Sequence, residues 1–263
     1  FMIPNDGPTY DATLAALKAG YRHIDTAAGY MNESDVGKAI KDSGIDRKEI
    51  FITSKLWLQD YGYENAKKGI ETSLKLLGVD YIDLYLLHQP YGDYLGAWKA
   101  LEEAYQEGKI KSIGISNITV NLWNKFKNGM TVMPAVNQVE FNPFVQQKEL
   151  RKVMAENDIH LEAWYPLGHG NKDLLENETI VSLAKKYNKN AGQIILRWIY
   201  QEGVISLPKS TNEERMKGNI DIFDFELTDE EMKNMQALDT NKPSHNPEDP
   251  ANETRLMGLK IHD

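Results

Sequence analysis

Residues 64–87 read ENAKKGIETSLKLLGVDYIDLYLL and place a helix, a glycine and a strand in direct succession. Ala66, Ile70 and Leu74 recur at the spacing of one helical face. Gly78 follows the helix where a left-handed cap calls for glycine, and the apolar run after it is typical of a buried parallel strand. The stretch therefore predicts one unit of an α/β fold, in which a helix packs against a parallel sheet.

The same succession recurs along the chain. Helices are expected over residues 9–19, 95–107 and 191–202, each ending near a glycine that precedes a short apolar run. The complete set of expected strands has seven members: 21–26, 49–54, 81–87, 112–116, 135–140, 160–164 and 204–207. A longer polar interval, 168–178, comes before the last strand and predicts an extra helix. Such alternation is typical of a parallel sheet covered by helices.

Two closures of the sheet compete, an open doubly wound sheet and a closed (β/α)8 TIM barrel. Neither phosphate-binding pattern of open sheets occurs in the sequence, whether G-x-G-x-x-G after a strand or G-x-x-x-x-G-K-[ST]. Their absence favours the barrel, which needs eight strands. Because the chain opens directly on a loop and a helix, we expect the first strand to be missing from it. No linker divides residues 1–263, so they are expected to form a single domain.

The composition indicates a soluble globular protein. Of 263 residues, 41% are apolar and 26% charged, which excludes a disordered chain. No run approaches the roughly 20 apolar residues that cross a bilayer, and the first residues do not resemble a signal peptide. A net charge of −9 argues against a nucleic-acid partner, while the lack of cysteine excludes disulfides and cysteine nucleophiles. The histidines show no metal-binding spacing such as H-E-x-x-H. We expect a cytoplasmic enzyme that acts as a monomer.

In α/β barrels the active site lies at the carboxyl ends of the strands. Asp25 stands at the end of the first expected strand, and Tyr30 lies five residues further on. Lys55 ends the second strand and His88 follows the third, so these four groups are expected to converge. Each also has an ordinary structural interpretation: Asp25 as a helix cap, Tyr30 as a surface aromatic, Lys55 as a solvated or paired amine, and His88 as a core histidine.

Together these groups would permit a proton transfer. A phenol, with an ordinary pKa of about 10, is a poor proton donor at neutral pH. An ammonium beside Tyr30 would lower that pKa, and a carboxylate would keep the ammonium charged and in place. An imidazole can orient a carbonyl oxygen by donating a hydrogen bond. The hypothesis is a general acid for an oxygen that gains negative charge while hydride from a cofactor attacks its carbon.

A phosphate site is expected after the last strand. Lys209 and Ser210 precede a polar segment, 212–219, which reads as the start of a helix and contains Arg215. Barrels often bind phosphate at this place with helix N-termini and basic side chains. Lys209, Ser210 and Arg215 are therefore candidates for holding a phosphate monoester. A solvated helix start with ordinary charged residues is the alternative.

Seven stretches of the sequence resemble the aldo-keto reductases: GYRHIDTA (20–27), TSKLW (53–57), DYIDL (80–84), LHQP (87–90), GISN (114–117), PAVNQ (134–138) and LPKS (207–210). The resemblance covers almost the whole chain and is nearest to the microbial branch that includes the 2,5-diketo-D-gluconate reductases. It implies a (β/α)8 TIM barrel that reduces aldehydes or ketones, including keto-sugars, to alcohols. It also implies NADPH as the cofactor and no metal.

The resemblance implies a role for each of several residues. The catalytic residues would be Asp25, Tyr30, Lys55 and His88, with Tyr30 as the proton donor. The residues that would hold NADPH are Trp164 on the nicotinamide, Ser116, Asn117 and Gln138 on its carboxamide, Leu167 along the pyrophosphate, Lys209, Ser210 and Arg215 on the 2′-phosphate, and Asn219 beside the adenine.

The chain departs from the family pattern in two places. The family's opening β-hairpin and first strand have no counterpart before Phe1. Gly218 stands where many relatives carry Glu or Gln, which would weaken recognition of the adenine.

The substrate pocket is expected to be lined by aromatic rings. Trp57, His88 and Tyr165 are the candidates for contact with the substrate carbonyl compound. Residues 241–263 are expected to form a tail over the active-site mouth, where they would help to select the substrate.

Two other functions fit the same sequence. A cofactor-free isomerase or aldolase would use Lys55 to form a Schiff base, or Asp25 to remove a proton beside a carbonyl. A barrel that binds a nucleotide without turnover would serve as a redox-sensing subunit. Tight NADPH binding without a borohydride-trapped lysine adduct would argue against the first, and turnover would argue against the second.

Overall fold

The computed structural model describes residues 2–263. The chain divides into two compact units, one that runs to Asn137 and resumes at Asn246–Asp263, and one that comprises Gln138–His245. Hydrogen bonds join the strands in chain order from β1 to β7. Strand β5 (Val136–Glu140) begins in the first unit and ends in the second. The expectation of a single domain stays a prediction.

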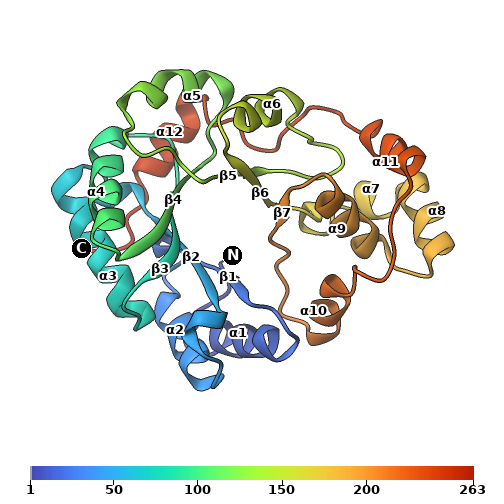
Figure 1. Cartoon of the computed structure of the whole chain (residues 1–263), viewed down its shortest axis with the longest axis horizontal. Coiled ribbons are helices and arrows are strands. Elements are labelled where there is room, and N and C mark those ends of the chain that lie inside the picture. The colour runs from blue at the N-terminus through green and yellow to red at the C-terminus, as the bar shows by residue number, and fades with distance from the viewer. Residues whose placement is uncertain (1) are drawn as a thin grey trace. The chain divides into compact units, whose positions relative to one another are not determined.

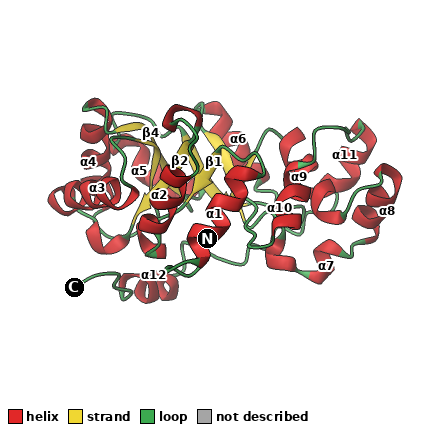
Figure 2. Cartoon of the chain, turned by 90° about the horizontal axis from the view of Figure 1, so that it is seen from below, coloured by secondary structure: helices red, strands yellow, loops and turns green. Residues whose placement is uncertain are grey.

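The first unit alternates helices with parallel strands. Its strands β1 to β4 pair in parallel, and Ala135 donates to the carbonyl of Ile113 where β5 begins. Figures 1 and 2 show helices α1 to α4 beside these strands. The elements are α1 (Pro8–Lys18), β1 (His23–Asp25), η1 (Ala28–Tyr30), α2 (Glu33–Asp42), η2 (Arg47–Glu49), β2 (Phe51–Leu56), η3 (Leu58–Asp60), α3 (Tyr63–Leu77), β3 (Ile82–Leu87), α4 (Tyr94–Gln106), β4 (Ile110–Ser116), α5 (Val120–Phe126), η4 (Lys127–Gly129) and α12 (Pro250–Met257).

The helix–glycine–strand stretch at 64–87 folds as its pattern predicts. Ala66, Ile70 and Leu74 of α3 are all buried. Gly78 ends the helix in the left-handed conformation with φ 65°, where a residue with a Cβ would be strained. The apolar residues of β3 then enter the core next to β4. A Cβ at Gly114 of β4 would meet the Leu86 side chain at 2.5 Å, so close packing of the two strands requires glycine there.

The second unit is rich in helices. Strands β6 and β7 are parallel, and Phe141 at the end of β5 donates to the carbonyl of Trp164 in β6. Phe141 stacks on Trp198 of α9 with ring centroids 5.4 Å apart, which fixes the helix against this part of the sheet. The elements are α6 (Lys148–Glu156), β6 (His160–Trp164), η5 (Gly168–Gly170), α7 (Lys172–Leu175), α8 (Glu178–Tyr187), α9 (Ala191–Gln201), β7 (Ile205–Ser206), α10 (Glu213–Ile220) and α11 (Asp229–Gln236).

The predicted α/β alternation is confirmed. Residues 2–263 contain seven strands, at the seven places that the sequence predicts and one fewer than a (β/α)8 barrel has. The expected extra helix before the last strand is present as α7 and α8, whereas α11 and α12 were not predicted. Strand β2 runs on to Leu56, so Lys55 lies inside the strand and not at its end. Within residues 2–263, no helix is long and apolar enough to cross a membrane.

Candidate active site

A buried ion pair joins the first two strands. Asp25 is the last residue of β1, and Lys55 lies in the adjacent strand β2. The Lys55 ammonium contacts the Asp25 carboxylate at 2.6 Å and donates to the carbonyl of Thr26 at 2.8 Å. The Lys55 side chain is fully buried, whereas that of Asp25 is 13% exposed. These two oxygens favour the charged form of the ammonium and help to fix its position.

Tyr30 and His88 lie beside this pair. Tyr30 ends the short helix η1 after β1, and the Lys55 ammonium lies 5.1 Å from the centroid of its ring. The His88 ring meets the Tyr30 ring edge to face, with centroids 5.5 Å apart. The structure thus brings Asp25, Tyr30, Lys55 and His88 together within the first unit. Asp25 caps no helix, because Ala27 and Asn32 occupy the N-cap positions of η1 and α2.

The pKa of the Tyr30 phenol is raised above its ordinary value, which corrects the expectation of a net lowering. Desolvation by the surrounding protein raises this pKa and is the largest effect. The Lys55 charge and hydrogen bond lower the pKa, as the sequence argument supposed, and Asp25 raises it. The Lys55 ammonium therefore offsets part of the rise in the Tyr30 pKa that desolvation causes, and the sequence did not predict that desolvation.

The His88 imidazole is neutral at physiological pH. Burial lowers its pKa well below the ordinary value, and the nearby Lys55 charge lowers it further. Its buried Nδ1 atom has no hydrogen-bond partner among residues 2–263. A proton on Nδ1 would be an unsatisfied buried donor, so the proton is better placed on Nε2. His88 is therefore suited to donate one hydrogen bond from Nε2.

Trp57 forms a wall beside His88. It follows β2, is buried, and meets the His88 ring edge to face with centroids 5.2 Å apart. A Cβ at Gly29 would lie 2.8 Å from the indole, so the glycine lets the Tyr30 loop approach this ring. The indole N–H donates to the carbonyl of Leu259 at 2.9 Å, which ties Trp57 to the C-terminal segment. Trp57 was a candidate from the sequence, whereas Gly29 was not.

Asn32 and Glu33 are buried polar residues that the sequence argument missed. Both stand at the start of α2, within three residues of Tyr30. Thr26 donates to the Asn32 side chain at 2.7 Å, and Ser54 donates to Glu33 at 2.5 Å. These contacts brace the ends of the two strands that carry Asp25 and Lys55.

Two further candidates of the first unit follow β4. Ser116 ends the strand and is buried, and Asn117 follows in the left-handed region with φ 58°, which asparagine tolerates better than most residues. The Asn117 amide donates to the carbonyl of His88 at 3.4 Å and to the Gln89 side chain at 3.3 Å. Ser116 and Asn117 therefore lie at the end of β4, beside the end of the neighbouring strand β3, which His88 follows.

In the second unit, Gln138, Trp164, Tyr165 and Leu167 lie on or after β5 and β6. The buried Gln138 amide donates to Glu162 at 2.7 Å, which fixes its orientation. Trp164 ends β6 and meets the ring of Tyr165 edge to face at 5.6 Å. Leu167 precedes η5 and is partly exposed.

The expected phosphate-binding residues surround the start of α10. Lys209 and Arg215 are exposed, Ser210 bonds the backbone of Asn212, and Asn219 lies near the end of the helix. Within residues 2–263, no ion pair joins Lys209 or Arg215 to a carboxylate. Two basic side chains beside a helix N-terminus are therefore available to an anion.

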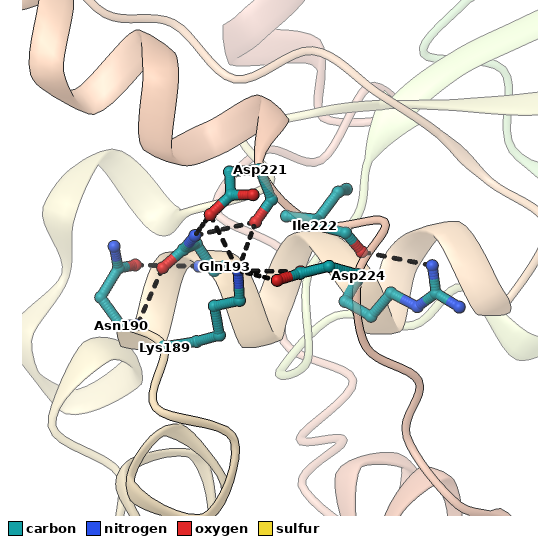
Figure 3. Close-up of polar contacts among 7 residues, drawn as sticks. Lys189, Asn190, Gln193, Asp221, Ile222 and Asp224 are labelled. Atoms are coloured by element: carbon teal, nitrogen blue, oxygen red, sulfur yellow. Dashed lines mark hydrogen bonds and ion pairs between the residues drawn. The ribbon is translucent and has the colours of Figure 1, made fainter.

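A polar network holds the far end of α10 against α9 (Figure 3). Lys189 contacts Asp221 and Asp224, each at 2.8 Å, and Gln193 donates to the carbonyl of Asp221 at 2.8 Å. Asn190 and Gln193 form a capping box at the start of α9. The network fixes the chain directly after Asn219 and Ile220, so it limits movement of the helix that carries Arg215.

No group of three or more acidic or histidine side chains within residues 2–263 is arranged to hold a metal ion. The groups that gather are an ion pair, a phenol and an imidazole.

Comparison with known proteins identifies the family. The model of the aldo/keto reductase family matches residues 5–240. The chain belongs to the aldo/keto reductase family. Among its relatives, the glyoxal reductase of Bacillus subtilis (strain 168) is 48% identical over 239 residues, which are 90% of this chain and 86% of that protein.

Solved aldo-keto reductases have the same fold. MGS-M4, from a Medee basin deep-sea metagenome library, matches with a TM-score of 0.90 and 45% identity over 92% of this chain and 90% of its own. The aldo-keto reductase of Bombyx mori, solved in complex with NADP, matches with a TM-score of 0.86 and 35% identity over 96% of this chain and 89% of its own. The strands and helices of this aldo/keto reductase are thus those of the predicted (β/α)8 barrel class, with seven strands in the described residues.

Proposed function

We propose that this aldo/keto reductase reduces aldehydes or ketones to alcohols with NADPH, and that Tyr30 donates the proton. The observation that carries the proposal is the buried Lys55–Asp25 pair, at 2.6 Å, beside the Tyr30 phenol and the neutral His88 imidazole. These groups supply what an oxygen needs as it becomes an alkoxide, namely a proton donor and a hydrogen bond that orients it.

His88 and Tyr30 would bind the same carbonyl oxygen. His88, with its proton on Nε2, donates a hydrogen bond that orients the oxygen without carrying a charge of its own. Tyr30 transfers its hydroxyl proton to the oxygen as negative charge develops there. Because the buried phenolate that remains would be unfavourable alone, the Lys55 ammonium stabilises it. Asp25 and the Thr26 carbonyl hold the ammonium in place while this happens.

The residues present fit NADPH. The exposed Lys209 and Arg215 beside the α10 N-terminus suit its 2′-phosphate, together with Ser210, and Asn219 of the same helix suits the adenine. When bound, NADPH supplies the hydride that the side chains cannot. In the first unit, Ser116 and Asn117 would bind the nicotinamide carboxamide. In the second unit the proposed contacts are Gln138 for the carboxamide, Trp164 for the nicotinamide ring and Leu167 for the pyrophosphate.

The aldolase alternative is disfavoured by the state of Lys55. A Schiff base forms from a neutral amine. Lys55 is fully buried, and its ammonium is held by the Asp25 carboxylate and a backbone carbonyl, which favour the charged form. The same pairing leaves Asp25 engaged, so it is poorly suited to remove a proton from a substrate.

We propose small aldehydes, dicarbonyl compounds and keto-sugars as the substrate class. A relative 48% identical to this chain is named a glyoxal reductase, and the sequence resembles the branch of the 2,5-diketo-D-gluconate reductases. Trp57 and His88 in the first unit and Tyr165 in the second would contact the substrate. Flat aromatic walls suit planar carbonyl groups. The monomeric state and the cytoplasmic location expected from the sequence stay predictions.

The test of the proposed function is consumption of NADPH in the presence of glyoxal, methylglyoxal, an aromatic aldehyde and 2,5-diketo-D-gluconate. Saturable oxidation of NADPH with stoichiometric alcohol formation is expected for at least one of them. Tight binding of NADPH without oxidation by any carbonyl compound would favour the redox-sensing alternative. A lysine adduct trapped by borohydride, without NADPH binding, would favour the aldolase.

Replacing Arg215 by alanine is expected to raise the KM for NADPH about 10- to 100-fold, because one charge-assisted hydrogen bond to the 2′-phosphate is lost. The KM for NADH, which lacks that phosphate, should change less than about twofold. Lys217, which is also exposed on α10 but paired with Glu214, provides the matched control Lys217→Ala. Equal effects of Arg215→Ala on both nucleotides would remove the 2′-phosphate assignment.

We also propose that the C-terminal segment, residues 241–263, helps to select the substrate. Its residues contact the segments that follow two strands. Leu259 accepts from Trp57 and His262 accepts from Gln59 at 2.8 Å, both after β2, and Glu248 accepts from Thr119 after β4 at 2.6 Å. The segment thus holds Trp57, which packs against His88.

Deleting residues 245–263 is expected to change the ratios of kcat/KM across a panel of carbonyl compounds by about tenfold, because Trp57 loses its partner and one wall of the pocket opens. Gln59→Ala, which releases only the end of the segment, should change the same ratios in the same direction by less. Unchanged ratios in both variants would refute the role of the segment.

A further inference from the structure

Glu33 is a buried carboxylate for which the proposed proton transfer has no direct use. It is the first residue of α2 and is 2% exposed. One carboxylate oxygen accepts from Ser54 at 2.5 Å, and the other accepts from Ser73 of α3 at 3.2 Å. Ser73 is also 2.8 Å from the hydroxyl of Tyr85, which can donate to it. Every hydroxyl of this cluster can therefore donate toward Glu33, as an ionised carboxylate requires.

The cluster lies directly behind Lys55. Ser54 precedes Lys55 in β2, and Ser54 is the register partner of Tyr85 in β3. Since successive side chains of a strand point to opposite faces, Ser54 and Lys55 lie on opposite faces of β2. Glu33 thus holds the strand from the face opposite to the Lys55–Asp25 pair.

The residue before Glu33 braces the same strands. The Asn32 side chain accepts from Thr26 at 2.7 Å and donates to the Thr9 hydroxyl at 3.2 Å. Thr26 in turn supplies the carbonyl that binds the Lys55 ammonium. Two consecutive residues at the start of α2 therefore fix both strands around Lys55.

Keeping a carboxylate at this position has a cost in stability. Burial raises the pKa of Glu33, and the hydrogen bonds from Ser54 and Ser73, together with the Lys55 charge, oppose part of that rise. A carboxyl whose pKa is higher in the folded state than in the unfolded state loses stability as the pH rises through its titration. Glutamine would fill the same volume and bond the same hydroxyls without this cost. A role in packing alone therefore does not account for the charge.

We propose that Glu33 is a positioning residue of the active site, whose carboxylate, held by Ser54 and Ser73 behind β2, supplies the second negative charge that balances the Lys55 ammonium. The inference rests on the proposed function, in which Lys55 stabilises the Tyr30 phenolate. When Glu33 is ionised, two carboxylates stabilise the Lys55 ammonium. Asp25 contacts it directly, and Glu33 acts from the opposite face of β2. Glu33 thus reduces the stabilisation that the Lys55 ammonium gives to the Tyr30 phenolate and contributes to the raised pKa of Tyr30.

The charged and titratable groups around this arrangement are few in the first unit. Asp25, Tyr30, His88 and His23 surround Lys55, and desolvation lowers the pKa values of both histidines. Glu33 faces Lys55 and Tyr85, and the Tyr85 hydroxyl in turn faces Asp60 and Tyr61. Burial raises the pKa values of Tyr85 and Tyr61, so both stay neutral at the pH of catalysis.

The test is the isosteric variant Glu33→Gln. Removing a negative charge favours the phenolate and disfavours the ammonium, so the pKa of Tyr30 should fall. We expect the basic limb of the pH profile of kcat/KM to move to lower pH by about 0.5 to 1 unit. On the plateau kcat should change less than about threefold, and the melting temperature at neutral pH should not fall. Glu33→Asp keeps the charge, so the basic limb of its kcat/KM profile should lie at the same pH as in the wild type.

Two controls separate charge from structure. Glu64→Gln removes an exposed carboxylate from the first turn of α3 and should leave the limb in place. Ser54→Ala removes the hydroxyl that favours ionised Glu33, so it should shift the limb in the same direction as Glu33→Gln but by less. It also serves as the second variant if Glu33→Gln does not fold.

A readout without substrate separates this inference from the proposed function. The ring Cζ signal of Tyr30 in the NMR spectrum of the apo protein, assigned by its loss in Tyr30→Phe, should begin to titrate at lower pH in Glu33→Gln than in the wild type. Coincident Tyr30 titrations, or a lower melting temperature with an unmoved limb, would overturn the inference and leave Glu33 a structural residue. If no carbonyl compound oxidised NADPH, the proposed function would be refuted, but the NMR comparison would still test the effect of Glu33 on Tyr30.

Discussion

Replacing Tyr30 by phenylalanine is expected to lower kcat for carbonyl reduction by about 10²- to 10⁴-fold, the usual contribution of a general acid. The phenyl ring keeps its edge-to-face contact with His88, whose ring centroid is 5.5 Å away, and only the hydroxyl is lost. The Kd of NADPH should change less than about twofold, because the proposed NADPH contacts do not include Tyr30.

The measurements are stopped-flow oxidation of NADPH and fluorescence titration of NADPH binding. Tyr63→Phe is the matched control, since it removes a phenol hydroxyl bonded to Glu103 in the same unit but away from Lys55. It should leave kcat within about twofold of the wild type. Loss of NADPH binding in Tyr30→Phe would show that the ring has a structural role and that proton donation is assigned to the wrong residue.

Replacing Lys55 by methionine is expected to lower both activity and stability. Methionine fills a similar volume but leaves the Asp25 carboxylate largely buried without its partner. Breaking a buried ion pair from one side typically costs about 3–5 kcal/mol of the free energy of unfolding, and here the 13% exposure of Asp25 places the value near the lower end. The phenolate also loses its stabilising charge, so kcat should fall by at least about 10²-fold.

A second substitution separates the two losses. In Lys55→Met combined with Asp25→Asn, the carboxylate that contacted the ammonium is removed as well, so part of the lost stability should return while kcat stays low. Lys67→Met is the control at an exposed pair: Lys67 contacts Glu103 at 2.6 Å, but its side chain is 42% exposed, so the free energy of unfolding should change little. Urea unfolding and steady-state kinetics check both effects. Recovery of activity in the double variant would contradict the role of Lys55.

The strands could be predicted because buried parallel strands are short apolar runs, and several of them follow a glycine that ends a helix. Gly78 and the run after it define α3 and β3, and β6 was predicted to its observed bounds, His160–Trp164. The end of β2 was predicted too early because Thr53, Ser54 and Lys55 are polar, although all three are buried in the fold. Helix α12 was missed, since its proline and asparagine residues suggest a loop, yet Pro250 occupies the first turn, where a helix accepts proline.

The positions of candidate residues could be predicted where strand order determines them. Burial and pKa could not be predicted, because they depend on packing. Asp25, Lys55 and His88 follow from strand order alone. Glu33 was missed because an acidic residue at a helix start reads as a solvated first-turn charge, and only the fold buries it under Ser54 and Ser73. The pKa of Tyr30 was expected to fall because the sequence indicates the ammonium but not the desolvation that outweighs it.

The most direct measurement of the central claim is a crystal structure of the Tyr30→Phe variant and of the wild type with NADPH and an unreactive carbonyl compound. In the wild type, we expect the carbonyl oxygen to lie within about 2.6–3.2 Å of both the Tyr30 hydroxyl and His88 Nε2, with Lys55 still paired to Asp25. In the variant, only the His88 contact should remain. A carbonyl oxygen bound away from Tyr30, or bonded to the Lys55 amine, would contradict the account.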